Sequence, residues 1–409
     1  MSDYQPGEGR FVGQQVRAIR ARRGISQQVL ADRVGFSRSA IAKYETGERP
    51  VDSRSTLYAL AQALGVTVGD LTGHEQDRFD PSAAGFHTSV PDIETALWTA
   101  GNTTPTGPTR TLDELATAAQ HAAKLRIDCD YATLGPMLAP MLTDCYRHLR
   151  DAAGADRDRA WDVLASIAHT TAAALKARGY SALSWTAAQE ADKAAENIGG
   201  TAATAAAAFA RSQVLLSRPG SLTAALEFAE GTAERISADV RTVGEVETLG
   251  MLHLQASLVT AALGGDPEPH LAEAAEQADR LATADPGTSI LRTPTFGPAN
   301  VAVWRMSAAM ERREPGQVLA LAPTLSPNEL PAEGRRAQYF VEIGRAHAMQ
   351  RNYQDSLYAL LRAEHAAPQH VRNMGHVKEL VGHMMRTARR DLTTGDLGKL
   401  AQRVGVVPA

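Results

Sequence analysis

Residues 37–49 bring together basic and small polar side chains that suit contact with nucleic acid. Arg38 can donate two hydrogen bonds to the O6 and N7 atoms of one guanine, and Lys43 can reach a guanine or a phosphate. Ser39 adds a small donor beside them, whereas Ala42 can contact only a thymine methyl group. A solvated basic helix face is the alternative interpretation. The chemistry indicated is recognition of DNA bases.

These side chains need a helix that presents them, and the neighbouring residues predict one over Ser37–Glu45. Gly35 suits a tight turn with positive φ, and Ser37 can cap the helix by accepting a backbone N–H bond. A short helix precedes the turn. The residues expected to bury the two helices against each other are Leu30, Ala31, Val34, Ile41 and Tyr44. This is the helix-turn-helix arrangement, in which the second helix enters the major groove.

Three further helices are expected around the motif, over 11–23, over 53–64 and from residue 68. Five helices with the motif at the second and third resemble the phage-repressor-like (Cro/XRE) DNA-binding family across residues 11–73. The positions that match the family pattern are Ile25, Ser26, Gln27, Gln28, Leu30, Ala31, Gly35, Ile41, Glu45, Gly47 and Pro50.

The resemblance implies roles for residues around the reading helix. Gln27 is expected to anchor a phosphate, and Arg49 is expected to clamp another together with the backbone near Thr46. Arg20 and Glu45 take positions that the family uses for an internal ion pair. The full expected DNA-binding set is Gln27, Ser37, Arg38, Ser39, Ala42, Lys43, Thr46 and Arg49.

The charge distribution agrees with this interpretation, although the net charge of the 409 residues is −4. Residues 8–49 carry nine basic and four acidic side chains, whereas residues 74–409 carry 32 basic and 39 acidic ones. A basic segment joined to an acidic remainder is the pattern expected if only the first part contacts phosphate.

The chain is long enough for more than one core, and its alanine-rich composition predicts an all-α fold. We expect a helix-turn-helix DNA-binding domain over 8–73 and a helical-repeat domain over 111–409. Between them, residues 74–110 contain four prolines and read as a linker, with one short helix at Asp92–Trp98.

The repeat prediction depends mainly on Ala337–His370, which predicts two antiparallel helices. Gly344 and Ser356 are small where the two helices must approach, and Phe340 and Leu360 are large where they must fill space. This spacing resembles the tetratricopeptide (TPR) pattern, and weaker units at uneven spacing extend it into a TPR-like α-solenoid. A generic helical bundle is the alternative.

A repressor-like domain followed by a TPR-like one resembles a group of bacterial regulators that includes peptide-sensing quorum regulators. The resemblance implies a homodimer with an effector in a concave groove lined by the first helix of each pair. Aligning the pairs on Ala337 places Gln255, Asn300 and Arg345 at groove-facing positions, where amides can hold a peptide backbone and arginine a carboxylate. The alternative is that they are exposed polar residues, or a helix cap for Asn300.

The predicted function is a sequence-specific transcriptional regulator on a palindromic operator, gated by a peptide or small-molecule effector. A DNA-bound scaffold that recruits a protein partner is the alternative. No catalytic, cofactor or metal-ligand pattern is recognisable, so an enzyme is not expected. Two cysteines and the absence of a long apolar run indicate a cytoplasmic protein without membrane contact.

Overall fold

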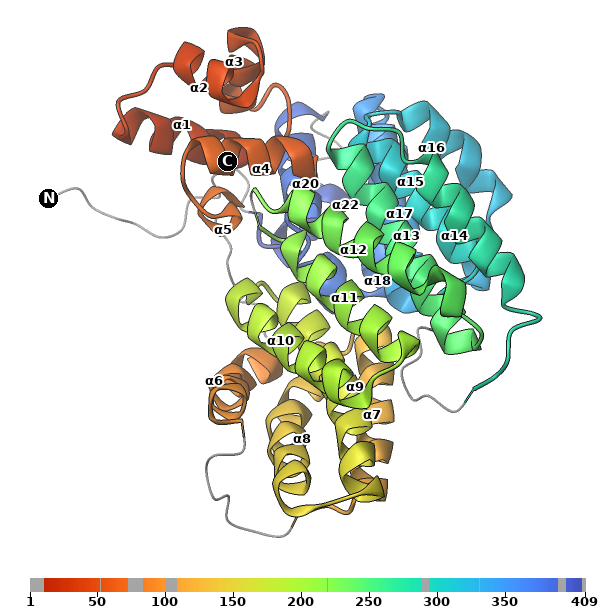
Figure 1. The fold of residues 1–409 in the computed structure, drawn as a ribbon. Coiled ribbons are helices and arrows are strands. Elements are labelled where there is room, and N and C mark those ends of the chain that lie inside the picture. The colour runs from red at the N-terminus through yellow and green to blue at the C-terminus, as the bar shows by residue number, and fades with distance from the viewer. Residues whose placement is uncertain are drawn as a thin grey trace, which may run out of the picture.

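The computed structural model is built from α-helices, as predicted, and has no strand within the residues that it describes (Figure 1). One isolated bridge joins Thr242 and Asp285. No helix among these residues is long and apolar enough to cross a membrane. The residues described are 11–51, 53–72, 84–100, 109–218, 220–287, 294–330, 332–388 and 395–406.

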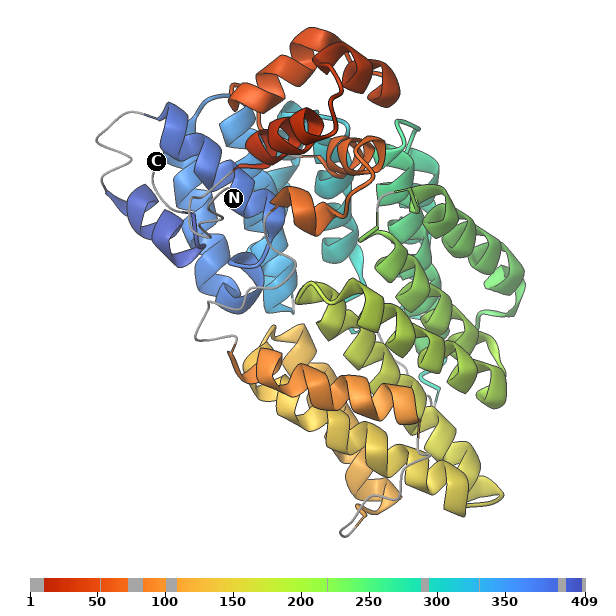
Figure 2. The same cartoon turned by 90° about the vertical axis from the view of Figure 1, so that its left-hand side faces the viewer.

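The first helices, here called the head, form a compact unit with its own apolar core. They are α1 (Val12–Arg22), α2 (Gln27–Val34), α3 (Arg38–Thr46), α4 (Arg54–Ala63) and α5 (Val68–Thr72). Val16, Leu30, Ile41 and Leu60 are fully buried at its centre. In Figures 1 and 2, α2 and α3 lie at the outer end of the molecule, while α4 and α5 face the remaining helices.

The remaining helices, here called the body, are α6 (Ala84–Thr99), α7 (Leu112–Ile127), α8 (Tyr131–Asp151), α9 (Ala155–Ala177), α10 (Ser181–Ile198), α11 (Thr201–Leu215), α12 (Leu222–Ile236), α13 (Val243–Ala262), α14 (Glu268–Arg280), α15 (Pro298–Glu311), α16 (Pro315–Leu321), α17 (Glu333–Met349), α18 (Tyr353–Ala366), α19 (Pro368–Val371), α20 (Gly375–Thr387) and α22 (Asp396–Arg403). From α7 to α18, most consecutive helices pair as antiparallel hairpins. The first helices of successive hairpins also contact one another, from α7 through α9, α11, α13 and α15 to α17. This is the stacking of a TPR-like solenoid.

The hairpin predicted over Ala337–His370 is present as α17 and α18. A Cβ atom on Gly344 would lie 3.1 Å from the Leu360 side chain, so glycine permits this close approach of the two helices. Asn352 caps α18 by accepting a hydrogen bond from the Asp355 amide at 3.4 Å. The small residues of the pattern therefore do what the sequence predicts.

The short helix expected at Asp92–Trp98 is the second half of the longer helix α6. Phe86, Ile93 and Leu97 are buried, and α6 packs on α8, where a Cβ on Gly135 would lie 2.7 Å from Phe86 Cα. Pro91 lies inside α6 and cannot donate a backbone hydrogen bond, which is why the sequence pattern suggested a later start. This part of the expected linker belongs to the core of the body.

The segment around α19, which follows the α17–α18 hairpin, is tied to the start of α8 and to the end of α9. The side-chain oxygen of Gln369 accepts from the Ala132 amide at 3.0 Å, and its Nε2 donates to Asp130 at 3.2 Å. The Arg178 guanidinium donates to the Gln369 carbonyl at 2.6 Å, and Asn373 donates to the Ala177 carbonyl at 2.8 Å. The solenoid therefore closes on itself instead of remaining an open curve.

Gly250→Ala is expected to destabilise the protein, because the new methyl group in α13 would lie 1.9 Å from the Phe296 ring. Overpacking of this kind costs about 1–3 kcal/mol. The midpoint of thermal unfolding, followed by circular dichroism, should fall. Gly231→Ala is the matched control, because it lies inside α12 with no atom within 4 Å of the added Cβ. The control should gain about 0.5–1 kcal/mol, and an equal response of both variants would contradict the packing described here.

Candidate DNA-binding surface and central cavity

Two capped helices and a glycine turn build the reading element of the head. Ser26 caps α2 by accepting from the Val29 amide at 3.2 Å, and Gly35 ends α2 with φ of 70°. Ser37 then caps α3 by accepting from the Ala40 amide at 3.1 Å. Gly47, with φ of 74°, ends α3. Each helix begins at a serine that accepts a free backbone N–H bond, and each ends at a glycine that adopts a positive φ.

The outer face of α3 is open to solvent. Arg38, Ser39 and Lys43 are exposed, whereas Ile41 and Tyr44 are buried in the head core. The expected base-reading side chains thus share one face, on the side of α3 away from that core. Ser37 and Thr46 are also exposed at the two ends of α3, and Ala42 is half-buried.

A buried ion pair fixes α3 on α1. Glu45 is buried, and its carboxylate receives the Arg20 guanidinium at 2.6 Å and 2.9 Å, the fork geometry in which such pairs are strongest. This hydrogen bonding raises the pKa of Arg20 above its ordinary value. Gln27 donates to the same carboxylate at 2.8 Å. The Gln27 amide, to which the resemblance assigns phosphate binding, is therefore held near the C-terminal end of α3.

Two basic side chains flank the end of α3. The Lys43 ammonium lies 3.3 Å from the Glu48 carboxylate, and both side chains are at least half exposed. The Arg49 guanidinium lies 5.1 Å from the centre of the Tyr44 ring. Surface pairs of this kind are weak, so Lys43 can exchange Glu48 for a phosphate or a base at little cost.

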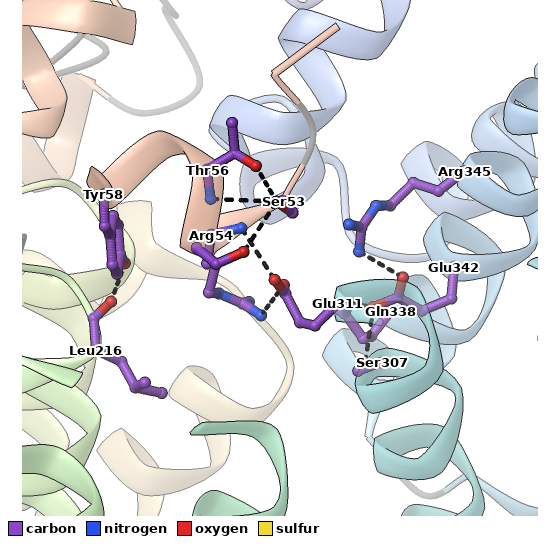
Figure 3. Close-up of polar contacts among 11 residues, drawn as sticks. Ser53, Arg54, Thr56, Tyr58, Leu216, Ser307, Glu311, Gln338, Glu342 and Arg345 are labelled. Carbon is purple, nitrogen blue, oxygen red and sulfur yellow. Dashed lines mark hydrogen bonds and ion pairs between the residues drawn. The ribbon is translucent and has the colours of Figure 1, made fainter. Parts of the chain in front are cut away.

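Helix α4 attaches the head to the body (Figure 3). The Arg54 guanidinium forms an ion pair with Glu311 at 3.1 Å, and the Arg54 amide donates to the same carboxylate at 3.0 Å. The Tyr58 hydroxyl donates to the Leu216 carbonyl, and burial raises the pKa of Tyr58 to about 12. Because the Glu311 side chain is 1% exposed, loss of Arg54 would leave a buried charge without this partner. We call these contacts the α4 clasp.

A second attachment involves the end of the reading helix. The Val12 amide donates to Glu379 at 3.1 Å, and His383 Nδ1 lies 3.3 Å from the Gly47 carbonyl. Both partners lie on α20 of the body. Since Gly47 ends α3, this contact joins α20 of the body to the end of α3.

Two cavities meet where the head rests on the body. The larger, of about 1300 Å³, lies between them and is lined by Arg54, Tyr58, Lys176, Glu379 and other residues of both parts. The smaller, of about 350 Å³, lies inside the closed solenoid. Residues of α7, α9, α11, α13, α15 and α17 line it, so the first helices of the hairpins face inward as expected. Arg54 and Tyr58 border both cavities.

The smaller cavity, here called the central cavity, suppresses the charged forms of its own residues. Burial, together with the positive charges of Arg54 and Arg335, lowers the pKa of Lys176 to about 7. Burial and the neighbouring cations lower the pKa of His370 to about 3. Arg54 and Arg335, two of the cations that lower these pKa values, line the cavity, so its lining carries positive charge.

Comparison with known proteins identifies the head. Residues 12–74 match the family model described as a helix-turn-helix domain. An uncharacterized transcriptional regulator in the ATPase CF(0) region of Rhodospirillum rubrum is 40% identical over 75 residues, which are 18% of this chain and 68% of that protein. The chain belongs to the helix-turn-helix transcriptional regulators.

Other relatives of this regulator share only a short segment with it. The immunity repressor protein of Bacillus phage phi105 is 44% identical over 64 residues, covering 16% of this chain and 44% of the repressor. The propionyl-CoA carboxylase regulator of Cereibacter sphaeroides is 38% identical over 68 residues, covering 17% and 14%. The regulator thus spans less than half the length of these two relatives.

One solved structure is similar over a longer stretch. It is that of Bacillus thuringiensis PlcR in complex with the peptide PapR7 and DNA, with 13% identity and a TM-score of 0.28. The match covers 66% of this regulator and 95% of that chain.

The three residues expected to bind an effector are all buried. Gln255 is fully buried and accepts a hydrogen bond from Gln213, and Asn300 donates to the Met251 sulfur at 3.5 Å. Neither lines the central cavity. Arg345 borders the larger cavity and forms a buried ion pair with Glu342 at 2.7 Å (Figure 3). The inward faces of α13, α15 and α17 instead carry other residues.

The residues that line the central cavity were not predicted from the sequence. In α7, the buried stripe Leu115, Ala119 and Ala122 continues in register to Arg126, which lines the cavity. The sequence does contain one signal for such a residue, which is a basic side chain on an otherwise apolar stripe of a helix. No local pattern relates Arg126 to Arg335, because two hundred residues separate them. Within the described chain, no group of histidine, cysteine or acidic side chains is arranged to hold a metal ion.

Glu45→Gln is expected to loosen the head, because it removes the charge that pairs with Arg20 inside the core. Hydrogen bonds to charged groups contribute about 1.5–3 kcal/mol, so amides of α1 and α3 should exchange with solvent deuterium faster. Hydrogen-exchange mass spectrometry on the full chain resolves these helices. Glu48→Gln removes an exposed carboxylate only three residues away and should leave the exchange unchanged. Similar acceleration in both variants would disprove the structural role of the Arg20–Glu45 pair.

Proposed function

We propose that this regulator binds a palindromic operator as a homodimer and that an effector in the body controls the placement of its two heads. The observation that carries the proposal is the position of the central cavity, which is bordered by Arg54 and Tyr58 of the head itself. A ligand in that cavity would lie against the helix that holds the head in place.

DNA recognition is assigned to the exposed face of α3. Arg38, Ser39 and Lys43 reach for base edges, with Ala42 near a thymine methyl group. Gln27, Ser37, Thr46 and Arg49 contact the phosphate backbone and position the helix. The exposure of α3 supports this assignment, because neither its outer face nor its N-terminus is used by the contacts that attach the head to the body.

The domain boundaries follow the same division. We assign DNA binding to residues 8–73 and effector binding to the closed solenoid, which we extend toward the N-terminus to include α6. The connection between them then lies within the first part of 74–110, before α6. A cytoplasmic location follows from DNA as the partner, and no catalytic activity is assigned.

A closed body favours a small effector over a recruited protein. The Gln369 contacts join the two ends of the solenoid, and the chamber inside has about 350 Å³. This volume is at the lower end of the range of small-molecule sites. An entire partner helix would need the ring to open.

Arg38→Ala is expected to abolish the preference for the operator while weak, salt-sensitive DNA binding persists. Loss of a bidentate contact with guanine costs about 1–3 kcal/mol in discrimination, whereas the phosphate contacts remain. Footprinting and titration against operator and scrambled DNA at two salt concentrations measure both effects. Arg157→Ala, an exposed arginine at the start of α9, is the control and should bind like the wild type. An unchanged operator footprint for Arg38→Ala would refute the assignment of the reading helix.

The full chain is expected to form a dimer at micromolar concentration. Two heads related by a twofold axis would place the two α3 helices about 34 Å apart, one turn of DNA, as half-sites of a palindrome require. Light scattering gives the mass in solution, and the spacing of protected half-sites gives the geometry on DNA. A monomeric mass together with a single protected half-site would reject the dimer.

A further inference from the structure

The central cavity is lined by cationic and neutral side chains only. Arg126 projects from α7, Lys176 from α9 and Arg335 from α17, with Arg54 of the head at the border. No aspartate or glutamate is among the described residues that line it. Charges of one sign gathered from three separate helices are unusual inside a fold, because each cation raises the energy of the others.

Two carboxylates that contact residues of the cavity lining are held by hydrogen bonds and ion pairs. Glu311 is paired with Arg54, and Glu342 with Arg345, Ser307 and Gln338. They are the carboxylates drawn in Figure 3, and both side chains are 1% exposed. Neither carboxylate forms an ion pair with Arg126, Lys176 or Arg335, so neither neutralises these cations.

Two of the arginines have no counterion in the described part of the chain. Arg126 forms no ion pair there, and its Nε atom is buried without a hydrogen-bond partner. Arg335 forms no ion pair either, and its guanidinium lies 5.6 Å from the centre of the Trp304 ring. Burial lowers the pKa of both Arg126 and Arg335, and the positive charge of Arg126 also lowers the pKa of Arg335. An unpaired charge in a partly dry site is costly unless a ligand neutralises it.

Aromatic side chains also line the central cavity. Tyr131 and Trp304 are buried at the cavity surface, with Phe209 beside His169, whose rings stack at 6.2 Å. The indole N–H of Trp304 is buried without an acceptor, and so it adds an unused donor to the wall. The chamber can hold a planar or apolar group as well as a charge.

We propose that the central cavity binds a small organic anion, whose carboxylate or phosphate group is held by Arg126, Arg335 and Lys176. Arginine guanidinium groups recognise both kinds of anion through paired hydrogen bonds, and the Lys176 amine, which donates to Gln213 in this structure, adds a further donor. The organic part lies against the aromatic walls. The anion supplies the negative charge that the described lining lacks.

This site deepens the proposed function and rests on it for its regulatory meaning. Arg54 borders the cavity and pairs with Glu311, so an anion bound there attracts the guanidinium away from that carboxylate. The α4 clasp would then weaken or re-form in a new position. Binding of an anion in the body would then affect the DNA-binding head through the Arg54 side chain.

Binding is tested on the full chain without DNA, using phenyl phosphate, inorganic phosphate, succinate and the neutral capped tripeptide N-acetyl-trialanine amide. Phenyl phosphate is expected to raise the midpoint of thermal unfolding in a saturable way, as a ligand of the native state does. Isothermal titration gives the dissociation constants. Inorganic phosphate and succinate should bind more weakly, because they cannot use the aromatic walls, and the tripeptide should not bind.

Three variants separate the site from general effects of charge. Arg335→Met and Arg126→Met keep most of the side-chain volume and should weaken phenyl phosphate binding at least tenfold. Arg336→Met on the same helix removes a surface cation paired with Glu333 and should bind like the wild type. Without ligand, Arg126→Met should also unfold at a higher temperature than the wild type, since it removes a buried cation that lacks a partner.

Several results would overturn the proposal. They are no anion binding at millimolar concentration, equal affinity for phenyl phosphate and inorganic phosphate, tight binding of the neutral tripeptide alone, or equal losses in Arg335→Met and Arg336→Met. DNA affinity is then measured with and without phenyl phosphate. Binding that leaves DNA affinity unchanged supports the anion site and rejects effector gating, so the two ideas fail separately.

Discussion

Gln369 joins the two ends of the body, and the rest of the architecture depends on this closure. Its side chain binds the start of α8, and its carbonyl accepts from Arg178, which is fully buried. A stack of hairpins would otherwise present an open, solvated groove. Closed in this way, the inward faces of the first helices surround the central cavity, where charges act more strongly on one another than in bulk water.

Because the solenoid is closed, the contact between head and body lies at the border of the central cavity. The head does not hang from a linker but is attached at α4 and at the end of α3. Arg54 belongs to the head, pairs with a buried carboxylate of the body and borders the central cavity. One side chain thereby connects the two parts that must communicate in a ligand-controlled regulator. Coupling of this kind needs a ligand whose affinity differs between the two head positions.

Opposite electrostatic conditions prevail at the two surfaces assigned to binding. The face of α3 is exposed, so its cations are solvated and can exchange Glu48 or water for DNA at little cost. In the central cavity, Arg126 and Arg335 are half-buried and lack counterions among the described residues. The first arrangement suits a partner that is a long polyanion, and the second suits a small one that can be enclosed.

The sequence by itself determined the helices, the helix-turn-helix motif, the Arg20–Glu45 pair and the hairpin over Ala337–His370. Each depends on residues whose spacing matches a helix period, a cap or a close helix crossing, and such signals are local or belong to a strongly patterned family. The extent of α6 was underestimated, because Pro91 resembles a boundary while Phe86 is buried by α8. Only the tertiary structure decided which side of each first helix faces inward, so Arg335 and Trp304 line the cavity rather than Gln255 or Asn300. It also decided that the solenoid closes and that Arg54 meets Glu311, since these contacts join residues hundreds of positions apart and depend on the summed rotation of many stacked hairpins.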